Sequence, residues 1–239
     1  MRPSRVITVL VRLHVAARPQ NLTFFPFNQR VIVLRRPLFS SSSSAPHSIN
    51  MQRVLFPRFH LAEIEDQSWC PEFLRTHTHR ALARAWKTST SKNGSAAFQA
   101  SKILVQELGG LSKTAEFTFI DSCAGAGGPT PIIEPALNKQ LSAAGLNNVQ
   151  FKLTDLWPDL KAWREITSKS ENISYVEEPI DATKAIRLSG EKKECRLYNL
   201  CFHHFDDPAA EKLLWSAVES SDAFVYVHTD LQSLTFTYL

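Results

Sequence analysis

EFTFIDSCAGAGGPT, residues 116–130, is the stretch of sequence that decides the fold. Its first six residues are rich in β-formers and predict a short strand. Gly125, Gly127 and Gly128 follow, and they predict a turn in which the backbone can approach a ligand more closely than any Cβ atom would permit. The segment 131–144 then predicts a helix, whose free N–H groups and positive dipole end would face that ligand. The stretch therefore predicts a binding site at a strand-to-helix turn.

Strands and helices alternate on the C-terminal side of this stretch. The predicted strands are 116–121, 148–155, 173–179, 195–202 and 223–228, and the predicted helices are 131–144 (with Thr130 as N-cap and Gly145 as stop), 159–167 and 208–221. Parallel strands need crossover connections, and such crossovers are right-handed. We therefore expect an α/β fold with a Rossmann-like, mostly parallel sheet and helices on both faces.

Two amphipathic helices are expected on the N-terminal side. The first begins at Pro71, and the second covers about 97–108 and ends at two glycines. Trp69, Trp86 and Phe98 are expected to be core aromatics, or else parts of a helical pair that covers a bound cofactor. We assign residues 51–110 to this helical extension and 111–239 to the ligand-binding domain.

The first fifty residues differ in composition from the rest of the chain. Residues 1–50 contain seven Arg, a serine run and no Asp, Glu or Lys, which is typical of a mitochondrial transit peptide. A disordered tail, or an untranslated stretch upstream of a true start at Met51, are the alternatives. We expect a mitochondrial protein if the leader is an import signal and a cytoplasmic one otherwise.

The amino-acid composition of the chain limits the kinds of partner that we expect. Seven of the 27 Lys and Arg residues lie in residues 1–50, which contain none of the 23 Asp and Glu residues. The rest of the chain is therefore slightly acidic, and we expect no nucleic-acid partner.

No run of about 18 uncharged apolar residues occurs, so we expect no membrane span. The four cysteines form no CxxC pair, which argues against a disulfide framework and against a structural zinc site. The oligomeric state stays open.

Three aspartates follow three successive predicted strands. In an open parallel sheet, ligands bind outside the carboxyl ends of the strands. Asp121, beside the glycine turn, would repel a pyrophosphate but suits a cationic ligand. Asp155 can accept hydrogen bonds from ribose hydroxyls, and Asp181 can accept one from an exocyclic amine. Together they predict a pocket for a positively charged nucleoside.

On these residues the chain resembles class I S-adenosylmethionine-dependent methyltransferases, over roughly residues 116–228. The resemblance implies S-adenosylmethionine as the cofactor and methyl transfer, with a small molecule as the expected acceptor, as the activity. The cofactor-binding residues that it implies are Asp121, Cys123, Gly125, Gly127, Asp155, Asp181 and Ala182. The opening EIEDQSWCPEFLR (63–75) is also similar to a little-characterised methyltransferase-like group in fungi and bacteria.

The segment after the fourth predicted strand is expected to meet the methyl acceptor. The resemblance places Asn199 near the end of that strand and FHHFDDP (202–208) in the segment that leaves it. Methyl transfer is an in-line displacement, so the protein mainly aligns the nucleophile with the methyl carbon. A base can remove a proton from the acceptor, and we expect His203 or His204 in that role.

The same segment contains metal-ligating residue types. Cys201, His203, His204, Asp206 and Asp207 lie close in sequence. Adjacent histidines on a strand or turn are expected to point apart, and no second ligand cluster occurs at a recognisable spacing. We therefore expect no metal site.

Three departures separate the chain from the family pattern. Cys123 stands in place of the first expected glycine, and the gap from Gly127 to Asp155 exceeds the usual distance of about twenty residues. We also expect the family's C-terminal helix and hairpin to be missing after the fifth predicted strand, which would leave a sheet edge unprotected. Two other functions stay open: a non-catalytic methyltransferase-like fold that binds or scaffolds, and a NAD-dependent oxidoreductase.

Overall fold

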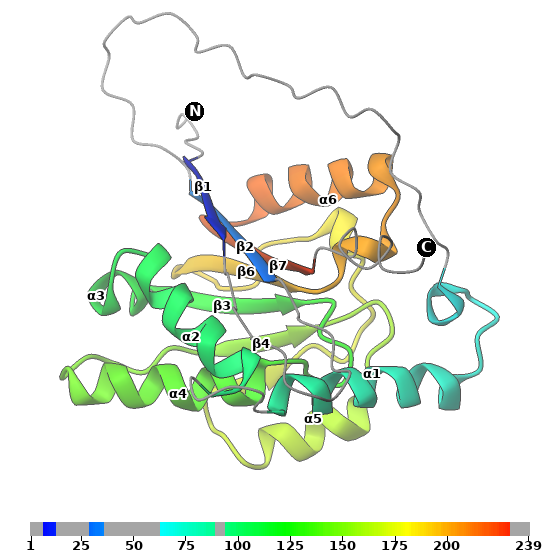
Figure 1. Cartoon of the computed structure of the whole chain (residues 1–239), viewed down its shortest axis with the longest axis horizontal. Coiled ribbons are helices and arrows are strands. Elements are labelled where there is room, and N and C mark those ends of the chain that lie inside the picture. Colours follow the sequence, from blue (N-terminus) through cyan, green and yellow to red (C-terminus); the bar gives the residue numbers. More distant parts are fainter. Residues whose placement is uncertain (1–6, 13–28, 36–62, 89–93, 230–239) are drawn as a thin grey trace, which may run out of the picture.

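The computed structural model describes residues 7–12, 29–35, 63–88 and 94–229. The elements in chain order are β1 (Ile7–Arg12), β2 (Gln29–Arg35), the 3-10 helix η1 (Ile64–Asp66), α1 (Glu72–Lys87), α2 (Ala96–Glu107), α3 (Leu111–Thr114), β3 (Phe117–Ser122), α4 (Thr130–Ala143), β4 (Phe151–Thr154), α5 (Leu160–Thr167), β5 (Ile173–Tyr175), η2 (Ala182–Lys184), β6 (Lys193–Asn199), η3 (Phe202–His204), α6 (Asp207–Ser220) and β7 (Ala223–Thr229). Figure 1 shows their arrangement.

The strands form one sheet in the order β1-β2-β7-β6-β3-β4-β5. The five strands from β7 to β5 are parallel to one another, and β2 and β1 are added antiparallel at the β7 side. The chain runs outward from β3 through β4 to β5 and then returns to β6 on the other side of β3. The strand order therefore reverses between β3 and β6, which is where ligands bind in open α/β sheets.

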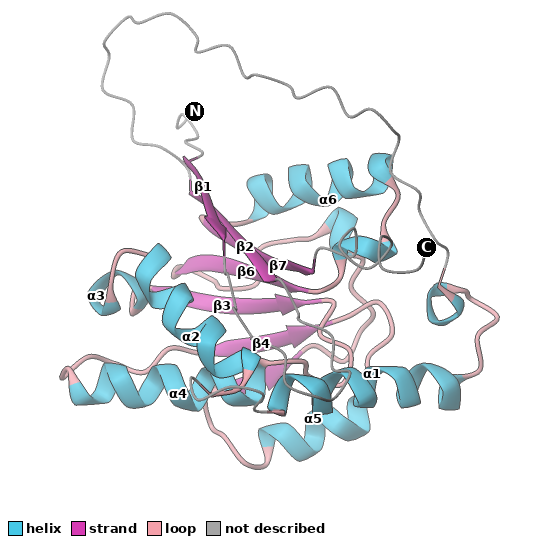
Figure 2. Cartoon of the chain, in the orientation of Figure 1, coloured by secondary structure: helices cyan, strands magenta, loops and turns pink. Residues whose placement is uncertain are grey.

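Helices cover both faces of the sheet, as Figure 2 shows. On one face a continuous core joins strand residues such as Phe119 and Phe151 to Leu137 of α4 and Trp163 of α5. The rings of Phe119 and Phe151 stack with their centroids 4.9 Å apart. On the other face, Tyr198 packs with residues of α6 and η2. Each such large side chain contributes about 1.5–3 kcal/mol when it leaves water.

This architecture confirms the predicted Rossmann-like α/β fold. All five predicted strands and the predicted helices occur in the expected order, although β5 is shorter than the predicted segment 173–179. Thr130 is not the N-cap that we expected. Pro129 holds that position, and Thr130 lies inside α4 with its hydroxyl donating to Asp121.

Of the three expected core aromatics, Trp86 is fully packed at 2% exposure, whereas Trp69 is 68% exposed. The core prediction is therefore correct for Trp86 and wrong for Trp69. It is also wrong for Phe98, which is 37% exposed and lies at the surface of α2. No helix in the described ranges has the length and apolar character needed to span a bilayer.

The edge of the sheet beyond β7 differs from our expectation. The sequence predicts an unprotected edge there and places residues 1–50 outside the fold. Instead, β2 pairs along β7, with Gln29 opposite Thr229 and Arg35 opposite Ala223, and β1 pairs with β2. Two strands from the leader therefore occupy the edge, and the import role of residues 1–50 stays a prediction.

Candidate functional site

Backbone strain is concentrated where β3 and β6 end. Among the residues that the structure describes, Cys123 (φ 60°) and Leu200 (φ 57°) are the two non-glycine residues with positive φ. Cys123 directly follows β3, and Leu200 directly follows β6. A non-glycine residue in the left-handed backbone conformation costs of order 1–3 kcal/mol of conformational free energy. Such strained residues occur most often at functional sites. The strain coincides with the reversal of strand order, which makes this edge the candidate site.

The turn from β3 to α4 requires glycine at position 127. Its φ is +95°, and a Cβ atom there would lie 2.3 Å from the Cδ1 atom of Ile166. Gly125 lies under α1, because a Cβ atom at this position would be 3.2 Å from Cγ of His79. The indole of Trp163 donates a hydrogen bond to the carbonyl of Gly125 over 2.9 Å. Side chains from two helices therefore fix the turn.

The carboxylate of Asp121 ties together the elements around the turn. It is fully buried, and its oxygens accept hydrogen bonds from Thr130 Oγ1 at 2.5 Å and from Asn199 Nδ2 at 2.9 Å. Burial raises the pKa of Asp121 to about 7; its two hydrogen bonds lower the pKa, and the nearby charge of Asp155 raises it further. Asp121 thus joins β3, α4 and β6, and the ligand contacts expected for Asp121 and Asn199 stay predictions.

Asp155 holds the turn from the end of β4. It is 7% exposed, and its oxygens accept hydrogen bonds from the backbone N–H of Gly125 and of Trp157, each at 2.7 Å. A carboxylate oxygen has two lone pairs, so each can accept a second hydrogen bond. Leu156 and Trp157 are partly exposed directly after Asp155, and the guanidinium of Arg75 lies 4.2 Å from the centre of the Trp157 ring.

Asp181 and Ala182 begin η2 at the same edge. The backbone N–H of Ile180 donates to the carbonyl of Asp155, which places this segment beside β4. Asp181 accepts hydrogen bonds from the N–H and the hydroxyl of Thr183. Burial acts to raise the pKa of Asp181, but these hydrogen bonds and the charge of Lys184 bring it below its usual value. Ala182 is buried, and its predicted contact with the cofactor, like that of Asp181, stays untested.

Cys123 is unsuited to nucleophilic chemistry. A hydrogen bond with Cys201 and burial raise the pKa of the Cys123 thiol well above its ordinary value, and the charges of Asp155 and Asp121 add to the effect. The thiolate is the nucleophilic form of cysteine. At neutral pH, Cys123 is therefore a neutral thiol that packs at the base of the turn.

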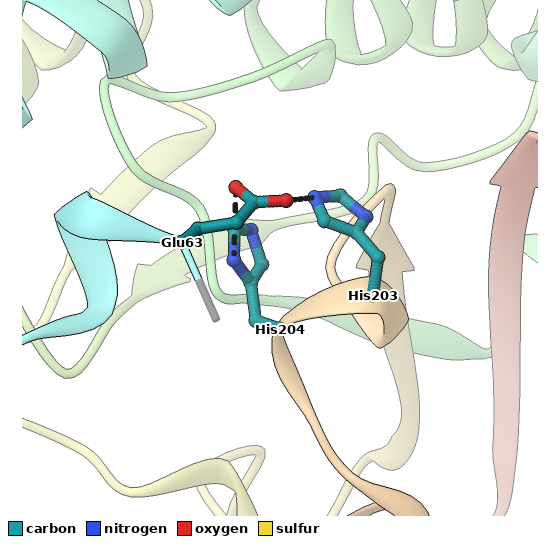
Figure 3. Close-up of side chains that lie close together, drawn as sticks. All are labelled: Glu63, His203 and His204. Carbon is teal, nitrogen blue, oxygen red and sulfur yellow. Dashed lines mark ion pairs between the residues drawn. The ribbon is translucent and has the colours of Figure 1, made fainter. Parts of the chain in front are cut away.

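His203 and His204 lie on η3, directly after β6, and Figure 3 shows Glu63 between them. Their rings do not point apart as we expected, because the short 3-10 helix brings the ring centroids to 4.1 Å. Burial lowers the pKa of His204, but the carboxylates of Asp66 and Glu63 outweigh it and raise the pKa above its usual value. His204 is therefore held next to carboxylates that favour its charged form.

A separate cavity of about 780 Å³ opens behind the glycine turn, between α1, α4 and α5. Ala126 and Gly128 are the residues of the turn that line it. Its cationic lining residues are Arg80, Arg84, Lys87, Lys161 and Lys169. Asp121, Asp155 and Asp181 do not line this cavity, so it is distinct from the carboxyl edge of the sheet.

Several residues of the candidate site were not expected from the sequence. Glu63, Asp66 and His79 come from the N-terminal segment, and only the tertiary fold brings them to residues after β6. Trp157 gave a usable signal, because it is an aromatic residue two positions after a strand-end acid. Arg75 gave none, since nothing in its local pattern indicates that it contacts Trp157.

No protein-family model matches this chain, and no curated protein matches it. Among solved structures, the chain is similar to phosphoethanolamine N-methyltransferase 1 of Haemonchus contortus, determined in complex with phosphoethanolamine and S-adenosylhomocysteine. The two are 14% identical, with a TM-score of 0.35, and the match covers 63% of this chain and 31% of the other.

Proposed function

We propose that the protein binds S-adenosylmethionine at the carboxyl edge of its sheet and transfers the methyl group to a small-molecule acceptor. The observation that carries this proposal is the glycine turn at the reversal of strand order, held by Asp155 through the backbone N–H of Gly125. Turns of this kind let a ligand approach the main chain directly.

The charge at this edge favours a cationic ligand. Asp121 and Asp155 are both buried, and the charge of Asp155 contributes to the raised pKa of Asp121. Perturbed carboxyl groups of this kind are common at functional sites. A sulfonium or ammonium group beside them would stabilise both ionised carboxylates, whereas a pyrophosphate would add to their repulsion. The site is therefore better suited to S-adenosylmethionine than to NAD.

The neighbouring residues suit the nucleoside part of the cofactor. Asp155 keeps lone pairs that can accept hydrogen bonds from ribose hydroxyls. Leu156 and Trp157 offer partly exposed apolar surface next to it. An aromatic ring is a good stacking partner for a nucleobase. These contacts would leave the end of β6, where η3 begins, to the methyl acceptor.

In the proposed reaction the sulfonium supplies the leaving group, and the chain's residues align and deprotonate the acceptor. His203 and His204 lie on η3, at the end of β6, where we place the acceptor. The raised pKa of His204 means that it is protonated over a wider pH range and acts as a base only above that pKa. Proton removal by His204 would therefore require a higher pH than proton removal by a free imidazole.

Calorimetric titration of the full chain with S-adenosylmethionine, S-adenosylhomocysteine and NAD tests the proposal. We expect saturable binding of both sulfur ligands at one site per chain and no binding of NAD. Binding of NAD alone would support an oxidoreductase and overturn the proposal. A folded protein that binds both sulfur ligands, but that forms no S-adenosylhomocysteine from S-adenosylmethionine when small-molecule acceptors are added, would support a binding or scaffold role.

A further inference from the structure

Glu63, His203 and His204 form a compact cluster, here called the His–Glu cluster, at the end of β6 (Figure 3). His203 Nε2 lies 3.4 Å from one Glu63 carboxylate oxygen, and His204 Nδ1 lies 3.6 Å from the other. One ligand atom from each residue lies within 4.8 Å of the other two. The three side chains are half-buried, so they are fixed in position but reachable from solvent.

Two of these separations are close to those between ligands of one metal ion. Nitrogen and oxygen ligands lie about 2.0–2.2 Å from Zn²⁺ with tetrahedral geometry, which sets neighbouring ligand atoms about 3.3–3.6 Å apart. The two distances from Glu63 to the imidazole nitrogens lie in this range. These two distances run to different oxygens of Glu63, and the two imidazole nitrogens lie within 4.8 Å of each other, so one cation would be held through both carboxylate oxygens or after the imidazoles close toward one of them.

The backbone of both segments is held independently of the cluster. The guanidinium of Arg75 is buried and donates hydrogen bonds to the carbonyls of Glu65 and Gln67, at 2.8 and 2.9 Å, which fixes η1 against α1. On η3 the backbone N–H of His204 donates to the carbonyl of Cys201. Glu63 directly precedes η1 and both histidines lie on η3, so two segments with their own hydrogen bonds present the ligands, as a preformed site requires.

The charge around the cluster is negative. Glu65 and Asp66 follow Glu63 closely in the chain, and the charges of both act on the Glu63 carboxylate. Asp66 lies 2.9 Å from the same Nδ1 atom of His204 that faces Glu63. A proton on Nδ1 satisfies these carboxylates, and a metal ion in its place would be bound by Glu63 and would lie close to the negative charge of Asp66. From α1, His79 is the titratable group that interacts with His204.

We propose that the His–Glu cluster binds a divalent first-row transition-metal ion of the Zn²⁺ type. Two imidazoles and one carboxylate favour such ions, whereas Mg²⁺ and Ca²⁺ prefer oxygen ligands alone. Three protein ligands leave a coordination position for water or for a ligand oxygen. The sequence did not predict this site, because Glu63 lies far from the histidines in the chain. The proposal does not depend on methyl transfer.

Titration of the metal-free full chain with Co²⁺ and with Zn²⁺, in the absence of any cofactor, tests this proposal. We expect one ion per chain, a visible Co²⁺ absorption band, and affinity that falls with decreasing pH because the proton on Nδ1 of His204 competes with the metal. His204→Gln and Glu63→Gln should each weaken binding by about tenfold or more. His77→Gln, an exposed position on α1, is the matched control and should leave affinity unchanged.

Circular dichroism of every variant shows whether it is folded. If a histidine variant fails to fold, the affinity of Glu63→Gln for the metal tests the proposal instead. Affinity that is unchanged in the double variant His203→Gln, His204→Gln would overturn the proposal, since the ion would then be bound elsewhere. The absence of stoichiometric binding to the folded protein would also overturn it and would leave these contacts as ion pairs of protonated histidines. Because no cofactor is present, neither result bears on the proposed binding of S-adenosylmethionine, which calorimetry tests separately.

Discussion

The carboxylate of Asp155 accepts a hydrogen bond from the backbone N–H of Gly125 across 2.7 Å, although thirty residues separate the two in the chain. The end of β4 therefore fixes the glycine turn that follows β3. Trp163 of α5 adds a second contact to the same residue, through its hydrogen bond to the Gly125 carbonyl. A turn held on both its N–H and its carbonyl is preorganised for ligand binding.

Asp155→Ala should both loosen the turn and remove the predicted ribose contact. We expect a loss of about 1–3 kcal/mol in the free energy of unfolding, because the N–H groups of Gly125 and Trp157 lose a buried partner. Binding of S-adenosylmethionine should fall as well. Chemical denaturation and calorimetry measure the two effects. Glu177→Gln, an exposed acid near the same edge, is the control, and equal effects in both variants would contradict the assignment.

Asp121→Asn should change the pH dependence of stability. Burial raises the pKa of Asp121 from 3.8 to about 7, so the folded chain keeps a proton that the unfolded chain releases between these values. The stabilising contribution of the Asp121 carboxyl group is therefore fully present below pH 3.8, the pKa of this group in the unfolded chain. The contribution is lost as the pH rises through about 7, and the free energy of unfolding falls by up to about 4 kcal/mol.

Asparagine has the same shape and can still accept from Asn199 and donate to the Thr130 hydroxyl, but it does not titrate in this range. The free energy of unfolding of Asp121→Asn, relative to that of the unsubstituted protein, should therefore rise as the pH increases from about 4 to about 7. Denaturation curves across this range measure the difference. A difference that is independent of pH would show that the carboxyl group has an ordinary pKa.

Gly127→Ala should disrupt the turn. The new Cβ atom would meet Ile166, and the φ of +95° is strained for any L residue, so we expect a cost of about 1–3 kcal/mol together with weaker cofactor binding. Gly145→Ala is a matched control, since Gly145 also has positive φ but no atom within 4 Å of an added Cβ. Thermal denaturation and calorimetry compare them. The assignment fails if cofactor binding weakens equally in both variants.

Loss of one partner of the buried ion pair of β6 should strongly destabilise the fold. Arg196 and Glu194 are fully buried and lie 2.8 Å apart. Glu194 also accepts hydrogen bonds from the N–H groups of Leu188 and Ser189. Glu194→Ala leaves a buried guanidinium without its partner, and we expect a loss of about 3–5 kcal/mol. Glu165→Ala removes the exposed pair with Lys169 and should cause no measurable change, as denaturation can show.

The order of strands and helices could be predicted because each element has its own local pattern. The hydrophobic run of β3 and the glycines after it are adjacent in the chain, and so is the helix that they introduce. Asp155 and Asp181 were placed at one edge by a general rule, since parallel strands present their carboxyl ends together. That rule predicts at which end of a strand a residue lies, but it does not predict which way the side chain of that residue points.

Other features depend on contacts between distant residues. Thr130 has a typical N-cap side chain, yet its hydroxyl donates to the buried Asp121, so tertiary structure outweighed the local preference. Glu63 meets His203 and His204 only because η1 lies over the end of β6, and no local pattern reports that placement. Likewise, the pairing of β2 with β7 joins strands from opposite ends of the chain.

Hydrogen–deuterium exchange of the full chain, with and without saturating S-adenosylmethionine, tests most directly that the carboxyl edge of the sheet holds the cofactor. The account predicts slower exchange at the amides of 123–128, 156–157 and 180–182, and no change along α5, which lines the cavity behind the turn. Slower exchange along α5 without any at 156–157 and 180–182 would contradict it, as would unchanged exchange throughout a folded protein.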